Sequence, residues 1–463
     1  MKFAHTLSFV SFAAVFMTLT SCTPEGNDIS PNDLELDRSL EQTIIACLNG
    51  EELSWMQMPS SSDLGNIPQD AANPLTSEKV VLGRLLFHET GLGTQATNES
   101  SIGTFSCASC HHAAGGFQAG VQQGIGDGGS GFGFAGEGRR QSDDYASTDV
   151  DRQPNRTPSA MNGAFTKLSL YNGQFGAGGE NTGTEGLWTA DTPLENNLLG
   201  YAGLETQAIA GLTVHRMAPD AAFFEAHPKY VDLFDAAFPS IAEANRYNVE
   251  YAGLAIAAYE RTLMASESPF QKWLGGQKSA MSDAQKRGAQ VFFGAAECAT
   301  CHSGPALSDG SFHAIGMLDM DQGSGSGSGG GAYTASNNFD EVAKGRGGFT
   351  GEAEDMYAFK TPQLYNLQSS AFMGHGGNYT SIREVVEYKV NASKDNPRVS
   401  GSSLDELFVP LALTDADVDD LVDFLSTGLY DGNLSRYEPS AVLSGGCFPN
   451  ADAQSSEDMG CSN

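Results

Sequence analysis

The sequence predicts a mainly α-helical protein with long loops and little β structure, arranged as two similar domains. Three observations support this: a Cys-x-x-Cys-His motif that occurs twice, a helix-like segment before each copy, and glycine-rich stretches between predicted helices. The motifs stand at 107–111 and 298–302, within the runs FSCASCHH and ECATCHS. A motif that is repeated together with its surroundings indicates a duplicated structural unit.

Each motif follows a segment with the pattern of a capped amphipathic helix. The two segments are LTSEKVVLGRLLFHE at 75–89 and MSDAQKRGAQVFFGA at 281–295. Serine is a favoured N-cap residue, and Ser77 and Ser282 each precede a charged first turn and an apolar stripe. We therefore expect a helix to lead into each motif, with these serines as the N-caps.

The two segments also agree residue by residue. Gly83 and Phe87 of the first segment stand in the same register as Gly288 and Phe292 of the second. Shared glycine and phenylalanine positions before a shared motif favour one type of domain that is present twice.

Two more helices and two loops complete the predicted framework. The apolar stretch 248–266 is predicted as a helix, and so is 413–429, with Thr414 as its cap and acids in its first turn. The glycine-rich segments 124–138 and 323–331 are predicted as loops, and neither has the spacing of a phosphate-binding loop.

The first 22 residues have the pattern of an export signal. Lys2 is followed by a mostly apolar run without acidic residues, which is too short to span a bilayer comfortably. The run ends LTSC, and this cysteine, Cys22, has the position at which bacterial lipoproteins are cleaved and acylated. An ordinary signal peptide with an incidental cysteine is the alternative. We expect a protein on the periplasmic side, anchored at the outer membrane through lipid on Cys22 and touching the membrane only there.

Charge and size narrow the functional classes. The chain has 463 residues, a formal net charge of −32 and a pI near 4.4. This charge argues against a nucleic-acid partner, because the phosphates would be repelled. The hydrophobic share of 40% is sufficient for packed cores, and the length accommodates two or three domains.

The eight cysteines fall into three groups. Cys22 is the predicted lipid site, and four cysteines form the two motifs. Cys47, Cys447 and Cys461 remain, in a compartment where cysteines pair. Cys447 and Cys461 flank a polar C-terminal loop and are the expected disulfide, with Cys47 as an alternative partner for either of them.

Three kinds of site use such cysteine pairs. A thioredoxin-like pair needs a βαβ context, which neither motif has, and a zinc site would join pairs that stand closer in sequence. A covalently attached c-type haem accounts for every residue: two thiols bond the vinyl groups, and the adjacent histidine becomes the proximal iron ligand. We therefore predict two c-type haems, one on Cys107, Cys110 and His111 and one on Cys298, Cys301 and His302.

The chain resembles the bacterial diheme cytochrome c peroxidases, a family that also contains the methylamine-utilisation protein MauG. The resemblance extends from Asn73 to Leu429 and implies two cytochrome c-like haem domains. It rests on the order and spacing of NPLTSEKVVLGRLLFHE, FSCASCHH, NRTPSAMNGAF, LETQAIAGLTVHRM, AIAAYERTLMASESPFQKWLGG, ECATCHSGPALSDGSFHAIGM, FKTPQLYNL and HGGNYTSIREVVEY.

These features give the predicted domain boundaries. They are a lipoprotein signal peptide at 1–22, a tether with an N-terminal helix at 23–72, a first haem domain at 73–275, a second haem domain at 276–435, and a C-terminal tail with the disulfide at 436–463. The resemblance assigns peroxide chemistry to the first haem domain and electron transfer to the second.

The resemblance also implies distal residues at the first haem, where the family has a glutamine and a glutamate. Gln207 matches the glutamine, whereas the glutamate position holds Arg216, with His215 beside it. A histidine transfers protons near neutral pH, and an arginine stabilises charge on a departing oxygen. We expect Gln207, His215 and Arg216 to act catalytically. The alternative is that His215 only packs and that another acid, such as Glu205, moves the proton.

At the second haem, the resemblance places the sixth iron ligand at Lys389. The thioether of Met373 is an equal alternative, and Tyr388 is a weaker one.

Three further features follow from the resemblance. Tyr171 stands where the family often has a tryptophan between the haems, and it either relays an electron or only packs. The carbonyl groups of Thr361 and Pro362 match a calcium site, which hard oxygen ligands suit. Many members close the first haem with a histidine from the following loop, but no histidine stands between His112 and His215 in this sequence.

The predicted function is reduction of hydrogen peroxide to water by a diheme c-type cytochrome peroxidase. The electron donor would be a small periplasmic cytochrome c or copper protein. A MauG-type oxidase that modifies a protein substrate and a non-catalytic diheme electron carrier are the alternatives. A homodimer is compatible with the resemblance.

Overall fold

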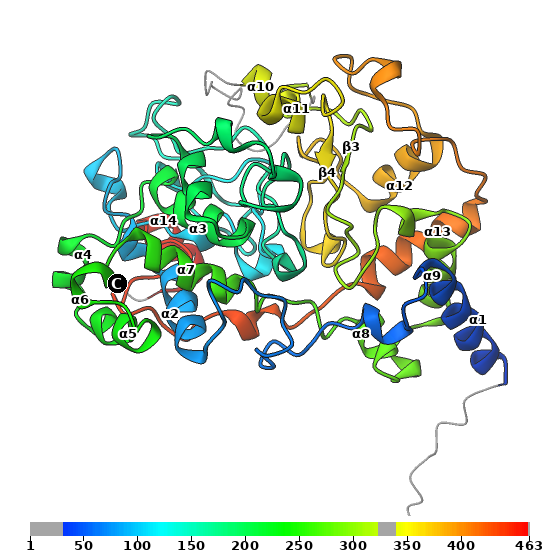
Figure 1. Cartoon of the computed structure of the whole chain (residues 1–463), viewed down its shortest axis with the longest axis horizontal. Coiled ribbons are helices and arrows are strands. Elements are labelled where there is room, and N and C mark those ends of the chain that lie inside the picture. The colour runs from blue at the N-terminus through cyan, green and yellow to red at the C-terminus, as the bar shows by residue number, and fades with distance from the viewer. Residues whose placement is uncertain (1–30, 323–338, 462–463) are drawn as a thin grey trace, which may run out of the picture.

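The computed structural model describes residues 31–322 and 339–461, so Cys22 and the loop predicted at 323–331 lie outside the described residues. The chain is mainly helical with very little strand, as predicted (Figure 1). The helices are α1 (Pro31–Cys47), α2 (Ser77–His88), α3 (Gly203–Val214), α4 (Ala221–Ala226), α5 (Lys229–Ala237), α6 (Glu243–Arg246), α7 (Val249–Glu260), α8 (Pro269–Leu274), α9 (Asp283–Phe293), α10 (Phe339–Ala343), α11 (Arg346–Thr350), α12 (Ile382–Asn391), α13 (Asp415–Asp423) and α14 (Ala453–Met459). The strands are β1 (Gly129–Ser130), β2 (Arg140–Gln141), β3 (Phe312–His313) and β4 (Phe359–Lys360), which form two antiparallel pairs, β1 with β2 and β3 with β4.

The helices gather at two ends of the molecule. We call the part around α2, α3 and α7 the first half, and the part around α9, α12 and α13 the second half (Figure 1). One cluster of buried apolar side chains extends through both, from Phe87 in α2 to Phe292 in α9. No helix among the described residues is long and apolar enough to cross a bilayer.

The glycines shared by the two motif-leading helices allow two close helix crossings. A Cβ atom on Gly83 of α2 would lie 1.8 Å from the carbonyl oxygen of Ala255 in α7. A Cβ atom on Gly288 of α9 would lie 1.9 Å from the carbonyl oxygen of Asp420 in α13. Only glycine permits either approach, so the repeated glycine reflects a repeated packing of two helices.

The predicted caps are confirmed at two helices and wrong by one residue at a third. Ser282 caps α9, and Thr414 caps α13, each in a capping box. At α2 the cap is Thr76, whose hydroxyl accepts from the backbone N–H of Lys79 at 3.2 Å, and Ser77 is the first helical residue. Both residues are of types that cap well, and Thr76 is the cap because its backbone is extended whereas that of Ser77 is already helical.

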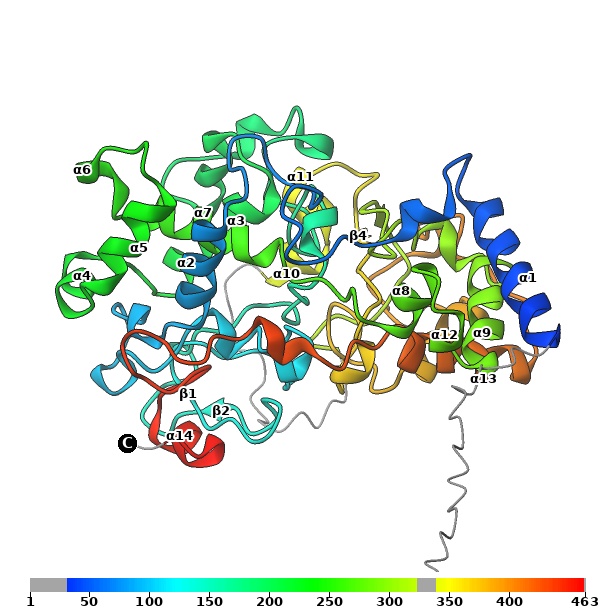
Figure 2. The same cartoon turned by 90° about the horizontal axis from the view of Figure 1, so that it is seen from below.

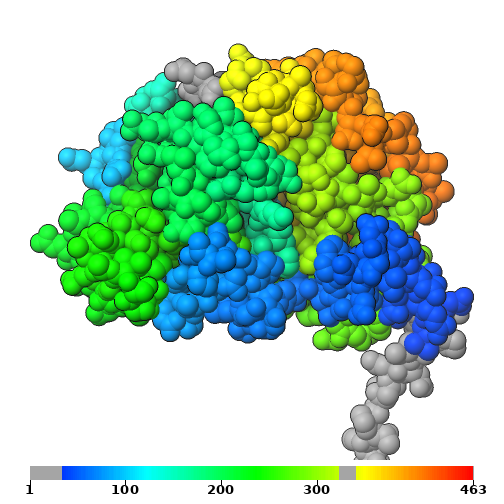
Figure 3. Space-filling model, in the orientation of Figure 1, coloured from blue at the N-terminus to red at the C-terminus, as the bar shows by residue number. Residues whose placement is uncertain are grey.

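The N-terminal helix packs on the far half of the molecule. Helix α1 lies against α9, where Asp37 accepts from the indole of Trp273 at 2.7 Å and pairs with the buried Lys286 at 2.8 Å. From there the chain returns along one edge to the first half, as the blue surface in Figure 3 shows.

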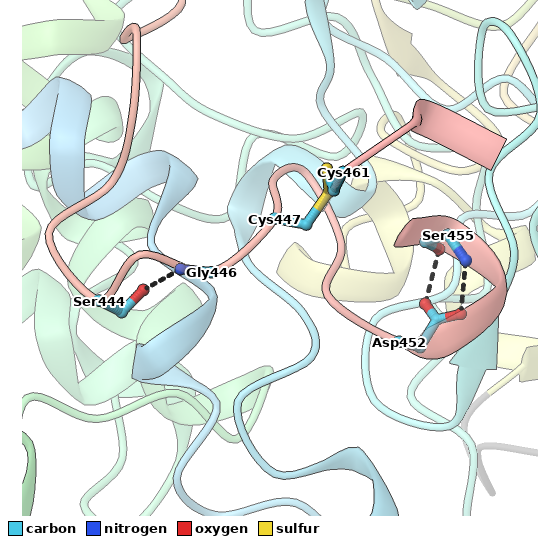
Figure 4. Close-up of a disulfide and its surroundings, with 6 residues drawn as sticks. All are labelled: Ser444, Gly446, Cys447, Asp452, Ser455 and Cys461. Carbon is cyan, nitrogen blue, oxygen red and sulfur yellow. Dashed lines mark hydrogen bonds between the residues drawn. A yellow bond between two sulfur atoms is a disulfide. The ribbon is translucent and has the colours of Figure 1, made fainter. Parts of the chain in front are cut away.

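The C-terminal tail makes the opposite crossing and ends beside the first half (Figure 2). Cys447 and Cys461 form a disulfide, the pairing expected from the sequence. Figure 4 shows it between a turn at Ser444–Gly446 and the start of α14, which Asp452 caps through Ser455. Cys47 is a free cysteine, and its thiol donates to the carbonyl oxygen of Phe293 at 2.8 Å.

The closed tail fastens the first motif and the glycine-rich loop. The carbonyl oxygen of Pro449 accepts from the hydroxyls of Ser106 and Ser109 at 2.9 and 3.1 Å. Asp452 pairs with the buried Arg139 at 2.9 Å, beside the short β1–β2 hairpin, whose first strand lies within the loop predicted at 124–138.

Candidate functional site: a cavity shared by the two motifs

A cavity of about 860 Å³ extends across both halves, and its wall is largely apolar. Both motifs line it. The motif side chains on its wall are Cys107, Cys110, His111, Cys298, Cys301 and His302. One continuous cavity therefore holds every residue for which the sequence predicts a role in haem attachment.

The same backbone turn presents each motif. The backbone N–H of His111 donates to the carbonyl oxygen of Cys107 at 3.1 Å, and that of His302 donates to Cys298 at 2.9 Å. One helical turn thus places the first cysteine and the histidine of each motif on the same face.

The two motif histidines are held in the same way. Nδ1 of His111 lies 3.1 Å from the carbonyl oxygen of Phe117, and Nδ1 of His302 lies 3.0 Å from that of Leu307. A carbonyl oxygen only accepts, so Nδ1 carries the hydrogen in both rings and the lone pair of Nε2 is left free. Burial lowers the pKa of both histidines to about 4, so both are neutral.

The residues that orient these histidines share an uncommon backbone conformation. Phe117 has a φ of 55° and Leu307 a φ of 50°, in the left-handed region that bulky residues seldom adopt. Such strain persists where the surrounding structure requires it. Here it turns a carbonyl group toward the motif histidine in each half.

The four motif cysteines fit covalent attachment of haem. All four are free, and burial raises the pKa of Cys110 and Cys298 to about 12. Cys110 and Cys298 are therefore protonated thiols, not thiolates poised to bind a metal ion. Neutral histidines with free Nε2 atoms, free thiols and an apolar cavity are the features that two c-type haems need.

Two of the three predicted distal residues reach the cavity. Gln207 and His215 both line the cavity wall. Gln207 lies on α3, and His215 directly follows the last residue of that helix. Nδ1 of His215 is hydrogen-bonded to a carboxylate oxygen of Asp151 at 2.8 Å, and Asp151 also lies on the wall, 7% exposed. Burial lowers the pKa of His215, but the charge and hydrogen bond of Asp151 outweigh it, so the pKa is raised.

Arg216 points away from this group. Arg216 is not among the described residues that line the cavity. Its guanidinium pairs with Asp127 at 2.5 Å and donates to the carbonyl oxygen of Asp149 at 2.6 Å. Its backbone has a φ of 57°. The chain therefore turns sharply between His215 and Arg216, and the expectation that both side chains face peroxide does not match this geometry.

Glu205, the alternative acid, is committed elsewhere. Its carboxylate accepts two hydrogen bonds from Arg261, at 2.9 and 2.6 Å, and both side chains are buried. Asn73 donates to the same carboxylate at 3.3 Å. Among the described residues, Glu205 is not one of those that line the cavity.

The sequence reasoning missed two acids on the cavity wall, Asp151 and Glu260. Glu260 ends α7 and is 7% exposed, and its Oε2 atom is buried with no hydrogen-bond partner in the described structure. Burial and the nearby Glu205 raise its pKa to about 8, so it is a neutral acid at pH 7. A polar residue at the inward end of an apolar helix is the signal that could have found it.

In the second half, Lys389 and Met373 line the cavity. Burial lowers the pKa of Lys389 to about 8, and its ammonium lies 5.8 Å from the ring centre of Phe408. Tyr388, the residue before Lys389 in α12, instead donates from its hydroxyl to the carbonyl oxygen of Ile315 at 2.5 Å. Of the two neighbours, Lys389 is therefore the one directed at the cavity.

Tyr171 lies between the halves. Its ring is 6.5 Å from that of His375, in an edge-on arrangement, and its carbonyl oxygen accepts from the backbone N–H of Lys360 at 2.7 Å. Thr361 and Pro362 line the cavity, but the carbonyl oxygen of Thr361 accepts from the hydroxyl of Ser308 at 2.7 Å. The calcium site at these carbonyl groups stays a prediction.

Comparison with known proteins finds the family that the sequence resembles. Residues 77–279 match the family model described as di-haem cytochrome c peroxidase. The chain is 29% identical over 379 residues to the methylamine utilization protein MauG of Methylorubrum extorquens, covering 81% of this chain and 83% of that protein. It is 28% identical over 397 residues to the cytochrome-c peroxidase IdrP1 of Pseudomonas sp. strain SCT, covering 82% and 87%.

The fold is also that of a solved relative. A MauG-like protein associated with microbial copper homeostasis aligns with a TM-score of 0.54 and 24% identity, over 80% of this chain and 96% of its own. The chain is therefore similar, over most of its length, to members of the diheme cytochrome c peroxidase and MauG family. The matched family model is that of di-haem proteins, and two Cys-x-x-Cys-His motifs stand on the cavity wall of this chain.

Proposed function

We propose that this protein reduces hydrogen peroxide to water, with electrons from a small periplasmic cytochrome c or copper protein. The observation that carries the proposal is the hydrogen-bonded pair of His215 and Asp151 on the cavity wall, where His215 directly follows the helix that carries Gln207. Each peroxide consumes two electrons and two protons and yields two waters. The site therefore needs a group that moves protons near neutral pH, which a histidine does well.

The haems held at His111 and His302 would supply, when bound, the iron that binds peroxide and the electrons that reduce it. The protein supplies the proton transfer. Asp151 holds the Nδ1–H of His215, so Nε2 is the atom that accepts a proton from one peroxide oxygen and returns it to the departing one. The side-chain amide of Gln207 donates a hydrogen bond that orients the peroxide.

Arg216 is a positioning residue in this proposal. It pairs with Asp127, whose backbone carbonyl oxygen accepts from the N–H of Asp151 at 2.9 Å. The hydroxyl of Tyr145 donates to the same Asp127 carboxylate at 2.6 Å. Arg216 thus stabilises the loop that carries Asp151, and it does not touch the peroxide.

The second half would store and relay an electron. Lys389 or Met373 is the proposed sixth ligand of its iron, and Tyr171, between the halves, the proposed relay. A MauG-type oxidase would be favoured by a tyrosine at the second iron. The engagement of Tyr388 with Ile315 supports the peroxidase instead.

The test is peroxide reduction by the purified diheme protein carrying His215→Ala. General acid–base catalysis contributes about 10²–10⁴-fold, so we expect kcat/KM for peroxide to fall by about that factor with both haems retained. His313→Ala is the matched control, because His313 is also a cavity histidine paired to a carboxylate, Asp405, at 2.7 Å, but in the second half. The control should keep most of the activity.

Two results would contradict the proposal. Equal losses in His215→Ala and His313→Ala would show that His215 has no special part in proton transfer. If peroxide fails to oxidise the fully reduced wild-type protein within seconds, the protein is an electron carrier and not a peroxidase.

A further inference from the structure

We propose that Arg156 and Lys360 bind the propionate carboxylates of the two haems, at the seam where the halves meet. The inference rests on the covalent haems of the proposed function, and it assigns two binding residues outside the two Cys-x-x-Cys-His motifs and the distal group. Both side chains line the cavity, and neither has a carboxylate hydrogen-bonded or paired to it among the described residues.

Arg156 is a buried arginine with neutral partners only. It is 1% exposed, and its guanidinium donates to the carbonyl oxygen of Phe372 at 2.9 Å, to the side-chain oxygen of Gln118 at 3.0 Å and to the carbonyl oxygen of Ala119 at 3.4 Å. It also donates to the hydroxyl of Ser370. Its remaining nitrogen, Nη1, is buried without an acceptor among the described residues.

Lys360 shows the same deficit from the other half. Its ammonium donates to the carbonyl oxygen of Leu168 at 2.9 Å, across the seam. Burial alone lowers its pKa to about 8, and burial lowers that of Arg156 to about 10. Both cations adjoin Tyr171: the backbone N–H of Lys360 donates to the Tyr171 carbonyl oxygen, and the charge of Arg156 acts on the phenol.

Arg156, which is buried, and Lys360, which is partly buried, have no counter-ion among the described residues and call for an anion in the cavity. Removing a charge from water costs several kcal/mol unless an opposite charge or several hydrogen bonds compensate. The chain carries 57 acidic residues against 25 basic ones, yet none of the described acids is paired with these two cations. A carboxylate matches the fork of an arginine, and each haem, when bound, would bring two carboxylates.

The position of the cations fits this ligand. Each bridges the halves, because Arg156 of the first half contacts Phe372 and Ser370 of the second, and Lys360 of the second contacts Leu168 of the first. Propionates directed at the seam would reach them from both sides. A nearby cation favours the reduced, less positive iron, so these residues would raise the reduction potential as well as hold the haems.

The test is a spectroelectrochemical titration of holoprotein with Arg156→Gln or Lys360→Gln, after haem content has been measured. We expect two haems per chain in each variant and a lower midpoint potential for at least one haem. Arg156→Lys keeps the charge and should retain most of the wild-type potential. Arg346→Gln is the control, since Arg346 is also buried and also bridges the halves, but it has a carboxylate near by, Asp355 at 3.6 Å, and lies off the cavity wall.

The outcomes separate the two assignments. Fewer than two haems in the wild-type protein would refute the proposed function itself. Two haems with unchanged potentials in both Arg156→Gln and Lys360→Gln would overturn this inference alone, and so would an equal shift in Arg346→Gln. Potentials that depend on added acetate would point to a free carboxylate at the site in place of a propionate.

Discussion

Two histidine–carboxylate pairs line the same cavity, one in each half. His215 is paired with Asp151 at 2.8 Å, and His313 is paired with Asp405 at 2.7 Å. In both pairs Nδ1 is bonded to the carboxylate, so Nδ1 carries the hydrogen and Nε2 is the nitrogen that can accept a proton. The pairs differ in their neighbours: His215 adjoins Gln207 on α3, whereas a second acid, Asp309, lies 3.7 Å from His313.

The pH dependence of activity should report the Asp151 carboxylate. Asp151 raises the pKa of His215, and peroxide must lose its proton to the neutral ring, so activity is lost as pH falls through that pKa. Asp151→Asn can still accept from Nδ1–H but removes the charge. We therefore expect the acid limb of kcat/KM to move to lower pH and the plateau to fall, by less than in His215→Ala.

Asp405→Asn is the matched control for this change. It removes the carboxylate from the second-half pair and should leave the acid limb where it is. An unshifted acid limb in Asp151→Asn would show that another group, with the buried acid Glu260 as the first candidate, sets the pH dependence.

At the scale of elements, the two halves repeat more than the Cys-x-x-Cys-His motif. A glycine crossing precedes each motif, at Gly83 and Gly288, and a residue with positive φ follows it, at Phe117 and Leu307. The first lets two helices pack closely behind the motif. The second turns a carbonyl group onto the motif histidine, which fixes the ring that would bind iron.

Gly288→Ala should destabilise the protein by forcing α9 away from α13. The added methyl would lie 1.9 Å from the backbone oxygen of Asp420, and overpacking of this kind costs about 1–3 kcal/mol. Chemical denaturation measures the loss. The comparison is Gly211→Ala in α3, where the nearest atom to the new methyl is the Gln207 amide at 3.4 Å. That change should be neutral or add up to about 1 kcal/mol, because alanine favours a helix.

Equal effects of the two substitutions would contradict the close-crossing explanation. If Gly83→Ala destabilises the protein as much as Gly288→Ala does, the close-crossing explanation also holds for the first half.

At the scale of the whole molecule, the two ends of the chain cross. The N-terminal helix α1 packs on α9 of the second half, and the C-terminal tail contacts the first motif through Pro449 and the glycine-rich region through Asp452 (Figures 1 and 2). Each half is therefore held partly by a segment distant in sequence. The proposed domain boundaries divide the chain by sequence, whereas the apolar core is continuous across them.

The lipid anchor predicted at Cys22 lies outside the described residues and stays a prediction that a single substitution tests. Cys22→Ala should release the protein from the membrane fraction of its own cell and leave haem content and peroxide reduction unchanged. Wild-type protein that fractionates as free periplasmic material would exclude the anchor.

Sequence was sufficient wherever a feature is local. The two haem motifs, the helices before them, the glycine register and the Cys447–Cys461 pairing each depend on residues that stand close together in the chain or repeat at fixed spacing. The cap of α2 was placed one residue late, at Ser77 instead of Thr76, because both residue types cap well. The helix predicted at 248–266 ends at Glu260, where Arg261 turns to bind Glu205.

The tertiary structure alone decided the distal group. Asp151 and His215 are 64 residues apart, and no periodicity links them. The neighbours His215 and Arg216 point to different places because α3 ends at Val214, and beyond a helix end each residue's own φ and ψ set the direction of its side chain. The sequence therefore determined which chemistry the protein carries. The packing of distant loops decided which side chains face it, because only packing brings such residues within hydrogen-bond distance.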